Sequence, residues 1–331
     1  MTVALDIEAL AGRIRDARGL HHKRDIDAVV ARLGLGGRHA AVPVGDDCAA
    51  IPDGDGHLLF AIEGFLDSFV AADPYFAGYC GIMVNLSDVA AMGGRPLAVV
   101  DALWSRDAGA ADPVLAGLSD AAALYGVPVV GGHTNTRAAA GNLAVAILGR
   151  AGRRLLTSFD AAAGDDLVAA IDLRGRFREP HPYWDASTGA PGERLRGDLA
   201  LLPGLAEDGL ADAAKDISMA GVVGTTLMLL ECSRVGGVID LDAIPKPEHV
   251  PLARWLTAFP SFGYLLSVRP DRTSAALARF AERGIASARI GRLDASRVAR
   301  VRAATGAEAV IWDFAASPLI GCGRLCSGAA A

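Results

Sequence analysis

The spacing of apolar residues in the first half of the chain changes between strand-like and helix-like. The run HLLFAIEGF predicts a buried strand at Leu58–Glu63, and Pro74 opens a long apolar helix that Gly93 and Gly94 end. Further elements are predicted in chain order: a strand at 96–104, a helix at 112–126 with Asp112 as N-cap and Pro113 in its first turn, and strands at 127–134 and 142–150. The first half therefore reads strand, helix, strand, helix, strand, strand.

A similar alternation restarts after Arg150. The segment AAAGDDLVAAIDL predicts a turn and a strand, and residues 174–197 predict a polar loop that is rich in Gly and Pro. The elements predicted beyond it are strands at 210–218, 237–243, 262–270 and 287–295, and helices at 219–236 and 273–283. The chain is thus predicted to have an α/β (α+β) fold with two domains, residues 1–150 and 151–331.

Length and composition agree with a two-domain globular protein. The chain has 331 residues, of which 52% are hydrophobic, with 32 Lys and Arg against 38 Asp and Glu. No block of like charge suggests nucleic acid or an anionic membrane as a partner, and no apolar run reaches the length of about 18 residues that a membrane span needs. The N-terminus lacks the pattern of a signal peptide, and the five cysteines lack disulfide or metal spacing. A cytoplasmic location is therefore expected.

The stretch VNLSDVAAMGGRP places two polar residues in the first predicted helix. Asn85 and Asp88 lie at i and i+3, so both project from one side of an otherwise apolar helix. Such a pair faces a cavity, a metal or a buried polar partner, or is satisfied within the core. The pattern leaves these alternatives open.

Two other acidic segments have a similar character. Asp46 and Asp47 follow Gly45 between apolar segments, and adjacent carboxylates suit a cation such as Mg²⁺, although a solvated turn has the same composition. Glu63 interrupts the predicted buried strand, where a carboxylate needs a partner unless it leaves the core at the strand end. We favour a functional role for Glu63.

Two segments have the composition of phosphate-binding sites. In VVGGHTNTR, Gly131 and Gly132 let backbone amides approach a phosphate, and His133 and Thr134 follow at once. In KDISMAG, Asp216 ends a strand, and Ser218 is placed to cap the next helix, whose N-terminus favours anions. Sequence motifs of P-loop NTPases, α/β-hydrolases, HExxH metalloproteases and protein kinases are missing from the chain.

Together these motifs resemble the AIR synthase-related superfamily. GDDCAAI, NLSDVAAMGGRP, GGHT, GDDL and DISMAG occur in the order of that family, and IGRL near Ile290 extends the match. The superfamily includes aminoimidazole ribonucleotide synthetase, thiamine monophosphate kinase and selenophosphate synthetase. The resemblance implies an N-terminal domain that pairs with its copy into a β-barrel across a homodimer, and a C-terminal α/β domain. It also implies ATP and Mg²⁺ as cofactors.

The resemblance assigns roles to the motif residues. The residues expected to bind the nucleotide are Asp46, Asp47, Asn85, Asp88, Gly131, Gly132, His133, Thr134, Asp216 and Ser218. The expected metal ligands are Asp47, Glu63, Asp88 and Asp216, and the expected catalytic residues are Asp47 and His133.

The chain departs from the best-known members at several positions. Glu63 replaces an aspartate, His133 replaces the aspartate that the kinases carry, and Met219 replaces an acidic residue after Ser218. The segment PSFGYLL stands where thiamine monophosphate kinases bind their substrate. Cys326 is not expected to be a nucleophile, because no neighbour in the sequence would lower its pKa.

These features predict an ATP- and Mg²⁺-dependent enzyme, of kinase or ligase type, that activates a small molecule by phosphoryl transfer. The alternative is a dimer that binds nucleotides and has lost turnover; a thiamine monophosphate kinase or selenophosphate synthetase proper is a lesser alternative. Lys23, Tyr183 and Trp184 are expected to frame the substrate, although they equally suit an ordinary surface.

Overall fold

The computed structural model describes residues 6–33, 35 and 42–322 and divides the chain into two compact units. Unit 1 comprises Met1–Asp46, Leu155–Thr188 and Asp208–Ala331, and unit 2 comprises Asp47–Arg154 and Gly189–Glu207. Within the described ranges, no helix is both long and apolar enough to cross a membrane. The domain boundary at residues 150 and 151 stays a prediction.

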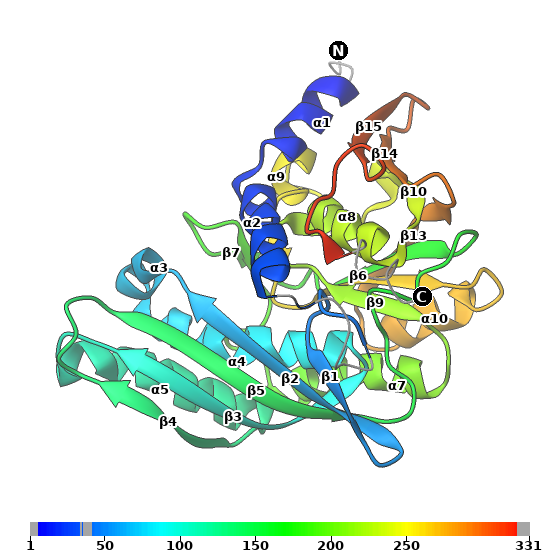
Figure 1. Cartoon of the computed structure of the whole chain (residues 1–331). Coiled ribbons are helices and arrows are strands. Elements are labelled where there is room, and N and C mark those ends of the chain that lie inside the picture. The colour runs from blue at the N-terminus through cyan, green and yellow to red at the C-terminus, as the bar shows by residue number, and fades with distance from the viewer. Residues whose placement is uncertain (1–5, 34, 36–41, 323–331) are drawn as a thin grey trace. The chain divides into compact units, whose positions relative to one another are not determined.

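Unit 2 is built on a five-stranded sheet with the strand order β1-β2-β5-β3-β4. Only the edge pair of β3 and β4 is parallel in this sheet, as the ribbon in Figure 1 shows. The elements of unit 2 are β1 (Ala49–Asp53), β2 (Gly56–Phe65), α3 (Asp67–Ala72), α4 (Pro74–Ala91), β3 (Gly94–Trp104), α5 (Ala108–Tyr125), β4 (Val129–Asn135), β5 (Asn142–Ala151), α6 (Gly192–Leu199) and α7 (Leu201–Glu207).

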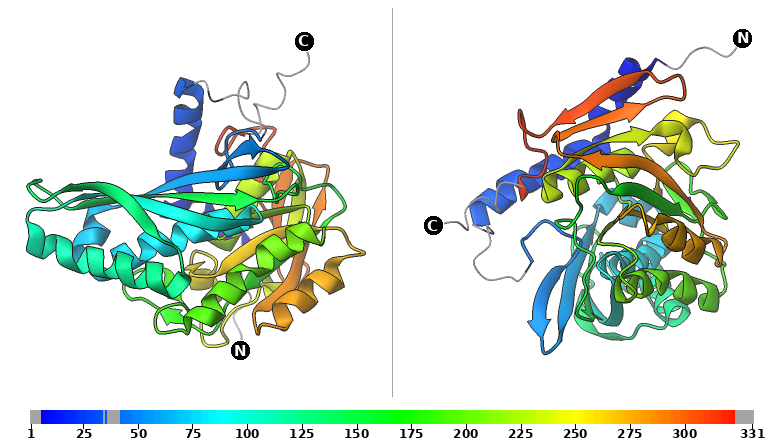
Figure 2. Two further views of the ribbon diagram at one scale, coloured as in Figure 1. Left: turned by 90° about the horizontal axis from the view of Figure 1, so that it is seen from below. Right: turned by 90° about the vertical axis from the view of Figure 1, so that its right-hand side faces the viewer.

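Helices α4 and α5 lie along one face of this sheet (Figure 2, left). They approach each other closely at two glycines. A Cβ atom on Gly78 would lie 2.0 Å from the carbonyl oxygen of Val114, and one on Gly117 would lie 1.9 Å from that of Tyr75. Because α4 is held between α5 and the sheet, almost its whole circumference is buried, which explains its nearly uniform apolar composition.

The two faces of the sheet differ in burial. Toward the helices, Ala61, Ile147 and Val99 lie in register on β2, β5 and β3, and each is at most 9% exposed. The opposite face remains open in the monomer. Its large apolar side chains are 36% to 66% exposed and comprise Ile51, Phe60, Ile62, Val100 and Leu148.

Unit 1 contains a seven-stranded sheet of order β15-β14-β10-β13-β6-β12-β9 and a small sheet of order β11-β8-β7. Its elements are α1 (Ile7–Arg15), α2 (Arg18–Leu33), β6 (Asp166–Ile171), β7 (Arg176–Phe177), β8 (Tyr183–Asp185), β9 (Ala213–Asp216), α8 (Gly221–Ser233), β10 (Gly236–Asp240), the 3₁₀ helix η1 (Leu241–Ala243), α9 (Leu252–Trp255), β11 (Phe259–Pro260), β12 (Gly263–Val268), α10 (Thr273–Ala281), β13 (Ala286–Asp294), β14 (Val298–Arg302) and β15 (Glu308–Asp313). Helix α8 packs on β9, β10 and β12, and its apolar side chains form much of the core.

The predicted elements are present in the predicted order, with three corrections. Helix α5 begins at Ala108 rather than at 112, because Asp107 is the N-cap and accepts a hydrogen bond from the Ala110 amide at 2.8 Å. Ser218 does not cap α8, whose first residue is Gly221. Instead, the backbone amide of Ser218 donates a hydrogen bond to the Thr225 hydroxyl. Residues 174–197 are not only loop, because they also contain β7, β8 and most of α6.

Candidate functional site

Helix α4 carries the polar pair of the NLSD motif into the interior of unit 2. Asp73 caps the helix and Pro74 occupies its first turn, so the observed start agrees with the prediction. Asn85 is fully buried, and its amide donates to the Gly81 carbonyl one turn earlier, at 2.8 Å. The other atom of this amide, Oδ1, is buried and has no hydrogen-bond partner in the part of the chain that the structure describes. A buried acceptor of this kind is costly unless a ligand satisfies it.

Asp47 reaches the same region from the segment before β1. One of its carboxylate oxygens lies within 4.8 Å of a carboxylate oxygen of Asp88, which is only 7% exposed. The following amide, that of Cys48, donates to the sulfur of Met92 at 3.1 Å and so fixes this segment at the end of α4. Two carboxylates at this separation repel each other unless a cation offsets their charge.

The neighbouring carboxylate of Asp46 has a structural role. It accepts hydrogen bonds from the amide of Ser158 at 2.7 Å and from its hydroxyl at 2.6 Å. The serine is itself buried, and its carbonyl accepts a hydrogen bond from Ser233. Asp46 therefore anchors its loop within unit 1, and the structure gives the two adjacent aspartates different surroundings.

Glu63 leaves the core at the end of its strand, which is one of the two alternatives that the sequence left open. On the helix-facing side of β2 the exposed fraction rises from 0% at Leu59 through 9% at Ala61, and Glu63 is exposed. The strand extends beyond the apolar cover, so the side chain meets solvent without a desolvation cost. Among the described residues, Glu63 belongs to no convergent group of three or more acidic, His or Cys ligands.

The GGHT motif forms part of β4, the edge strand of the sheet. Gly131, Gly132, His133 and Thr134 are all exposed, and the His133 ring lies 6.1 Å from the ring of Trp104, between centroids. Edge strands leave backbone groups on one side without ladder partners, so this strand can present amides to a phosphate.

Asp216 and Ser218 lie in unit 1, where Asp216 ends β9 as predicted and both are partly buried. Met219, which follows them, is 37% exposed. A side chain on Gly19 would meet the carbonyl of Met219 at 1.9 Å, so this turn packs tightly against the start of α2.

The predicted substrate residues have dissimilar surroundings in unit 1. Trp184 is 1% exposed and its indole donates to the Asp172 carbonyl at 2.9 Å, which makes it part of the core rather than of an open cleft. Tyr183 is half-buried, stacks on His181 and meets Phe259 edge-on. Lys23 is partly exposed on α2. Cys326 lies outside the described residues.

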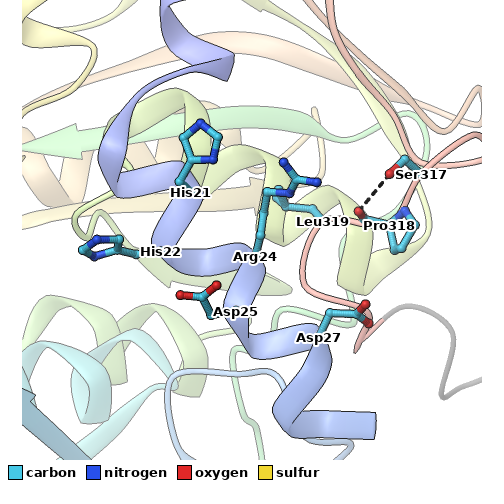
Figure 3. A pocket seen from close by; sticks show the side chains of 8 residues that line it. All are labelled: His21, His22, Arg24, Asp25, Asp27, Ser317, Pro318 and Leu319. Atoms are coloured by element: carbon cyan, nitrogen blue, oxygen red, sulfur yellow. Dashed lines mark hydrogen bonds between the residues drawn. The ribbon is translucent and has the colours of Figure 1, made fainter.

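A polar pocket of about 500 Å³ is lined in part by residues that neighbour Lys23 in the sequence (Figure 3). Helix α2 contributes His21, His22, Arg24, Asp25 and Asp27, and the opposite wall is the segment 317–319. The pocket therefore combines both signs of charge, and Lys23 itself is not among its lining residues.

Sequence reasoning missed one acidic residue, Asp101 of β3. It lies in register with Glu63 and Val145 on the helix-facing side of the sheet, and its Oδ2 atom is buried. Burial raises the pKa of this carboxyl, and a hydrogen bond from its own backbone only partly opposes the shift. The signal was present in the sequence, because Asp101 interrupts the apolar run PLAVVDALW just as Glu63 interrupts FAIEGF.

The fold and these motif positions define a mixed α/β protein with two domains of the AIR synthase type. The family description AIR synthase related protein, N-terminal domain, matches residues 45–151, and the corresponding C-terminal domain matches residues 192–303. The chain belongs to the AIR synthase related family.

Sequence similarity to two relatives covers most of the chain. The uncharacterized protein sll0787 of Synechocystis sp. is 46% identical over 312 residues, which is 93% of this chain and 96% of the relative. The uncharacterized protein MJ0640 of Methanocaldococcus jannaschii is 34% identical over 274 residues, 81% and 85% of the two chains.

Solved structures share the fold at lower identity. The structure of T. maritima PurL complexed with ATP has a TM-score of 0.70 and 20% identity, over 83% of this chain and 46% of that one. AaThiL complexed with AMPPCP and TMP has a TM-score of 0.64 and 20% identity, over 83% and 91%. The chain thus spans about half of PurL and nearly all of AaThiL.

Proposed function

We propose that the protein is an ATP- and Mg²⁺-dependent enzyme that activates a small molecule by phosphoryl transfer, as a kinase or a ligase. The observation that carries this proposal is the approach of Asp47 and Asp88, which lie 41 positions apart in the sequence, to within 4.8 Å. Solved relatives bound to ATP and AMPPCP support the choice of nucleotide.

The donor set fits Mg²⁺. The two carboxylates and the buried Oδ1 of Asn85 are hard oxygen ligands, and Mg²⁺ prefers such ligands together with phosphate oxygens and water. When bound, the ion would neutralise phosphate charge and orient the transferred group. Asp216 and Ser218 of unit 1 remain predicted metal and nucleotide contacts, and this assignment rests on the resemblance of their motif.

Strand β4 carries the residues predicted to bind phosphate and to transfer the proton. Its exposed glycine amides and the Thr134 hydroxyl would donate hydrogen bonds to phosphate oxygens. His133 would orient the acceptor oxygen or take up its proton as a general base.

Calorimetry of ATP binding with and without Mg²⁺ tests this proposal. Asp88→Asn should abolish the Mg²⁺-dependent part of the affinity, because it removes one of the two convergent charges. Asp55→Asn is the matched control, since Asp55 is an exposed carboxylate of the same unit. Equal Mg²⁺ dependence in the wild type and in Asp88→Asn would refute the metal site.

A binding protein without turnover is the second candidate. The exposed position of Glu63, outside any convergent group among the described residues, favours it together with the replacements at His133 and Met219. Incubation with ATP, Mg²⁺ and a pool of metabolites separates the two. Reproducible ADP release that falls in Glu63→Gln supports the enzyme, and tight ATP binding without release supports the binder.

We also propose that the open face of the sheet in unit 2 pairs with a second copy of the chain. Phe60 and Leu148 lie in register on this face, and Ile62 and Val100 both lie opposite Ala146, so the exposed apolar side chains are contiguous. Patches of this kind mark interaction surfaces. Light scattering should show a dimer for the wild type and a monomer for Ile62→Lys. Val310→Lys, which alters an exposed apolar residue of unit 1, should remain dimeric. A monomeric wild type would contradict this part.

A further inference from the structure

A cavity of about 570 Å³, open to solvent, lies between the second half of helix α5 and strands β3 and β4 of unit 2. The walls are mainly apolar and include Leu115, Leu118 and Ala122 of the helix. Of the described residues that line the cavity, Asp101 is the one that carries a charge. The volume lies within the range of about 300–1,000 Å³ that small-molecule sites occupy.

The carboxylate of Asp101 is poorly compensated by the protein. Its Oδ2 atom is buried and has no hydrogen-bond partner in the described chain. Its Oδ1 atom lies over Gly132, where a Cβ atom would be only 2.3 Å away. The second glycine of the GGHT motif therefore makes room for this carboxylate. A desolvated charge without a partner is costly, and a ligand of opposite charge would remove the cost.

The chemistry of the walls restricts the ligand. A single carboxylate among apolar side chains provides too few oxygens for Mg²⁺ or Ca²⁺, which need several oxygen ligands. The negative charge disfavours anions, including phosphates. An organic cation with an apolar body satisfies both the carboxylate and the walls.

We propose that this cavity binds a small organic cation, a primary ammonium or an amidinium on an apolar body, with Asp101 as its anchor. The cation donates hydrogen bonds to the buried carboxylate while its apolar part contacts the side chains of α5. The proposal does not depend on the metal site, because Asp101 belongs to no convergent group of potential metal ligands among the described residues.

Benzylammonium is a suitable probe, measured by calorimetry and by NMR shift perturbation without nucleotide or Mg²⁺. The wild type should bind it saturably at millimolar concentrations. Asp101→Asn should weaken binding about tenfold or more, because a charge-assisted hydrogen bond is lost. Asp112→Asn, the same charge change at an exposed position of α5 outside the cavity, should bind like the wild type.

Two further measurements separate charge from shape. Benzyl alcohol matches the probe in shape but carries no charge. It should bind the wild type more weakly than benzylammonium does. Its affinity for Asp101→Asn should equal its affinity for the wild type. Ala122→Phe should fill the cavity and abolish binding of both probes. Gly132→Ala should weaken benzylammonium binding while the net charge stays the same, because the added methyl group would meet both the carboxylate and the backbone carbonyl oxygen of Asp101.

The proposal is overturned if benzylammonium does not bind the wild type, or if it binds Asp101→Asn with unchanged affinity. If Asp101→Asn does not fold, Gly132→Ala and Ala122→Phe decide in its place, and unchanged affinity in both overturns the proposal. Loss of Mg²⁺-dependent ATP binding in Asp88→Asn would leave these results unaffected.

Discussion

Helices α4 and α8 both carry an acidic residue in an otherwise apolar, buried sequence, but the surroundings of the two carboxylates differ. Each is almost entirely buried, and each has an acidic residue in its last two turns, Asp88 in α4 and Glu231 in α8. The Glu231 carboxylate accepts hydrogen bonds from the amides of Leu319, Ile320 and Gly321, at 2.8, 2.7 and 3.3 Å. Asp88 lies instead beside a second carboxylate, and three positions before it in the sequence is the buried Oδ1 atom of Asn85, which has no hydrogen-bond partner among the described residues.

The difference is in how the charge of the two carboxylates is compensated by the protein. In unit 1 the protein itself supplies the positive ends of three backbone dipoles, so the charge of Glu231 is compensated in the folded state. In unit 2 the carboxylates of Asp47 and Asp88 approach each other to within 4.8 Å, and the Oδ1 atom of Asn85 is buried without a hydrogen-bond partner among the described residues. We propose that a bound cation offsets the charge of the two carboxylates there.

The largest expected effect comes from the compensated acid. Glu231→Ala leaves three buried amides without an acceptor and should lower the free energy of unfolding by about 3 kcal/mol or more. Urea titration followed by circular dichroism measures this change. Glu248→Ala, at an exposed glutamate of the same unit, should change it by less than about 0.5 kcal/mol. Equal stabilities of the two variants would show that the hydrogen bonds of Glu231 do not stabilise the fold.

Asp88→Asn, unlike Glu231→Ala, should leave the stability of the ligand-free protein nearly unchanged. Without Mg²⁺, the variant should be as stable as the wild type within about 1 kcal/mol, because the substitution relieves repulsion from Asp47. The increase in Tm that Mg²⁺ and ATP give the wild type should be lost. A variant that is strongly destabilised in the absence of ligand would place Asp88 with Glu231, as a structural residue.

Asp101 is a third acid, half-buried and with a buried Oδ2 atom, and the direction of its pKa shift predicts a dependence of stability on pH. Burial raises the pKa of Asp101, so the folded protein holds this proton more tightly than the unfolded chain. Its ionisation therefore costs stability as the pH rises above the unfolded value of about 4. Relative to the wild type, the Tm of Asp101→Asn should rise between about pH 4 and neutrality. A Tm difference that is constant over this range would contradict the buried charge.

The smallest effect is expected at the surface. Arg95 holds the pKa of Glu207 below its usual range through a hydrogen bond and its charge, but both side chains are about half exposed. Glu207→Gln should change the free energy of unfolding by about 0–1 kcal/mol, and less at high salt. A larger loss, measured by the same urea titrations, would show that exposure is a poor guide to the cost of losing a charge here.

Local patterns in the sequence predicted much of the fold. The start of α4 at Pro74 follows from capping chemistry, and strands β2 to β5 follow from apolar runs bounded by turn residues, whereas β1 was not predicted. The true start of α5 escaped prediction, because Asp107 and Asp112 are both good caps and only the observed bond from Ala110 distinguishes them.

The candidate site was predictable as a set of motifs but not as a set of environments. Asp46 and Asp47 are identical neighbours in the sequence, yet Ser158, 112 residues away, takes up the carboxylate of Asp46 alone. The partners of Glu231 lie about 90 positions downstream. Trp184 had the composition of a ligand contact, and its burial depends on packing against Phe177 and Trp255. Such long-range partners leave no local pattern.

The central claim is that Asp47 and Asp88 share a divalent cation. Crystals grown with ATP and Mn²⁺ in place of Mg²⁺ test it directly, because the anomalous scattering of Mn²⁺ locates the ion. The account predicts one strong peak coordinated by oxygens of both carboxylates and by phosphate. Bound nucleotide with no peak at these two side chains, or with Mn²⁺ held elsewhere, would contradict it.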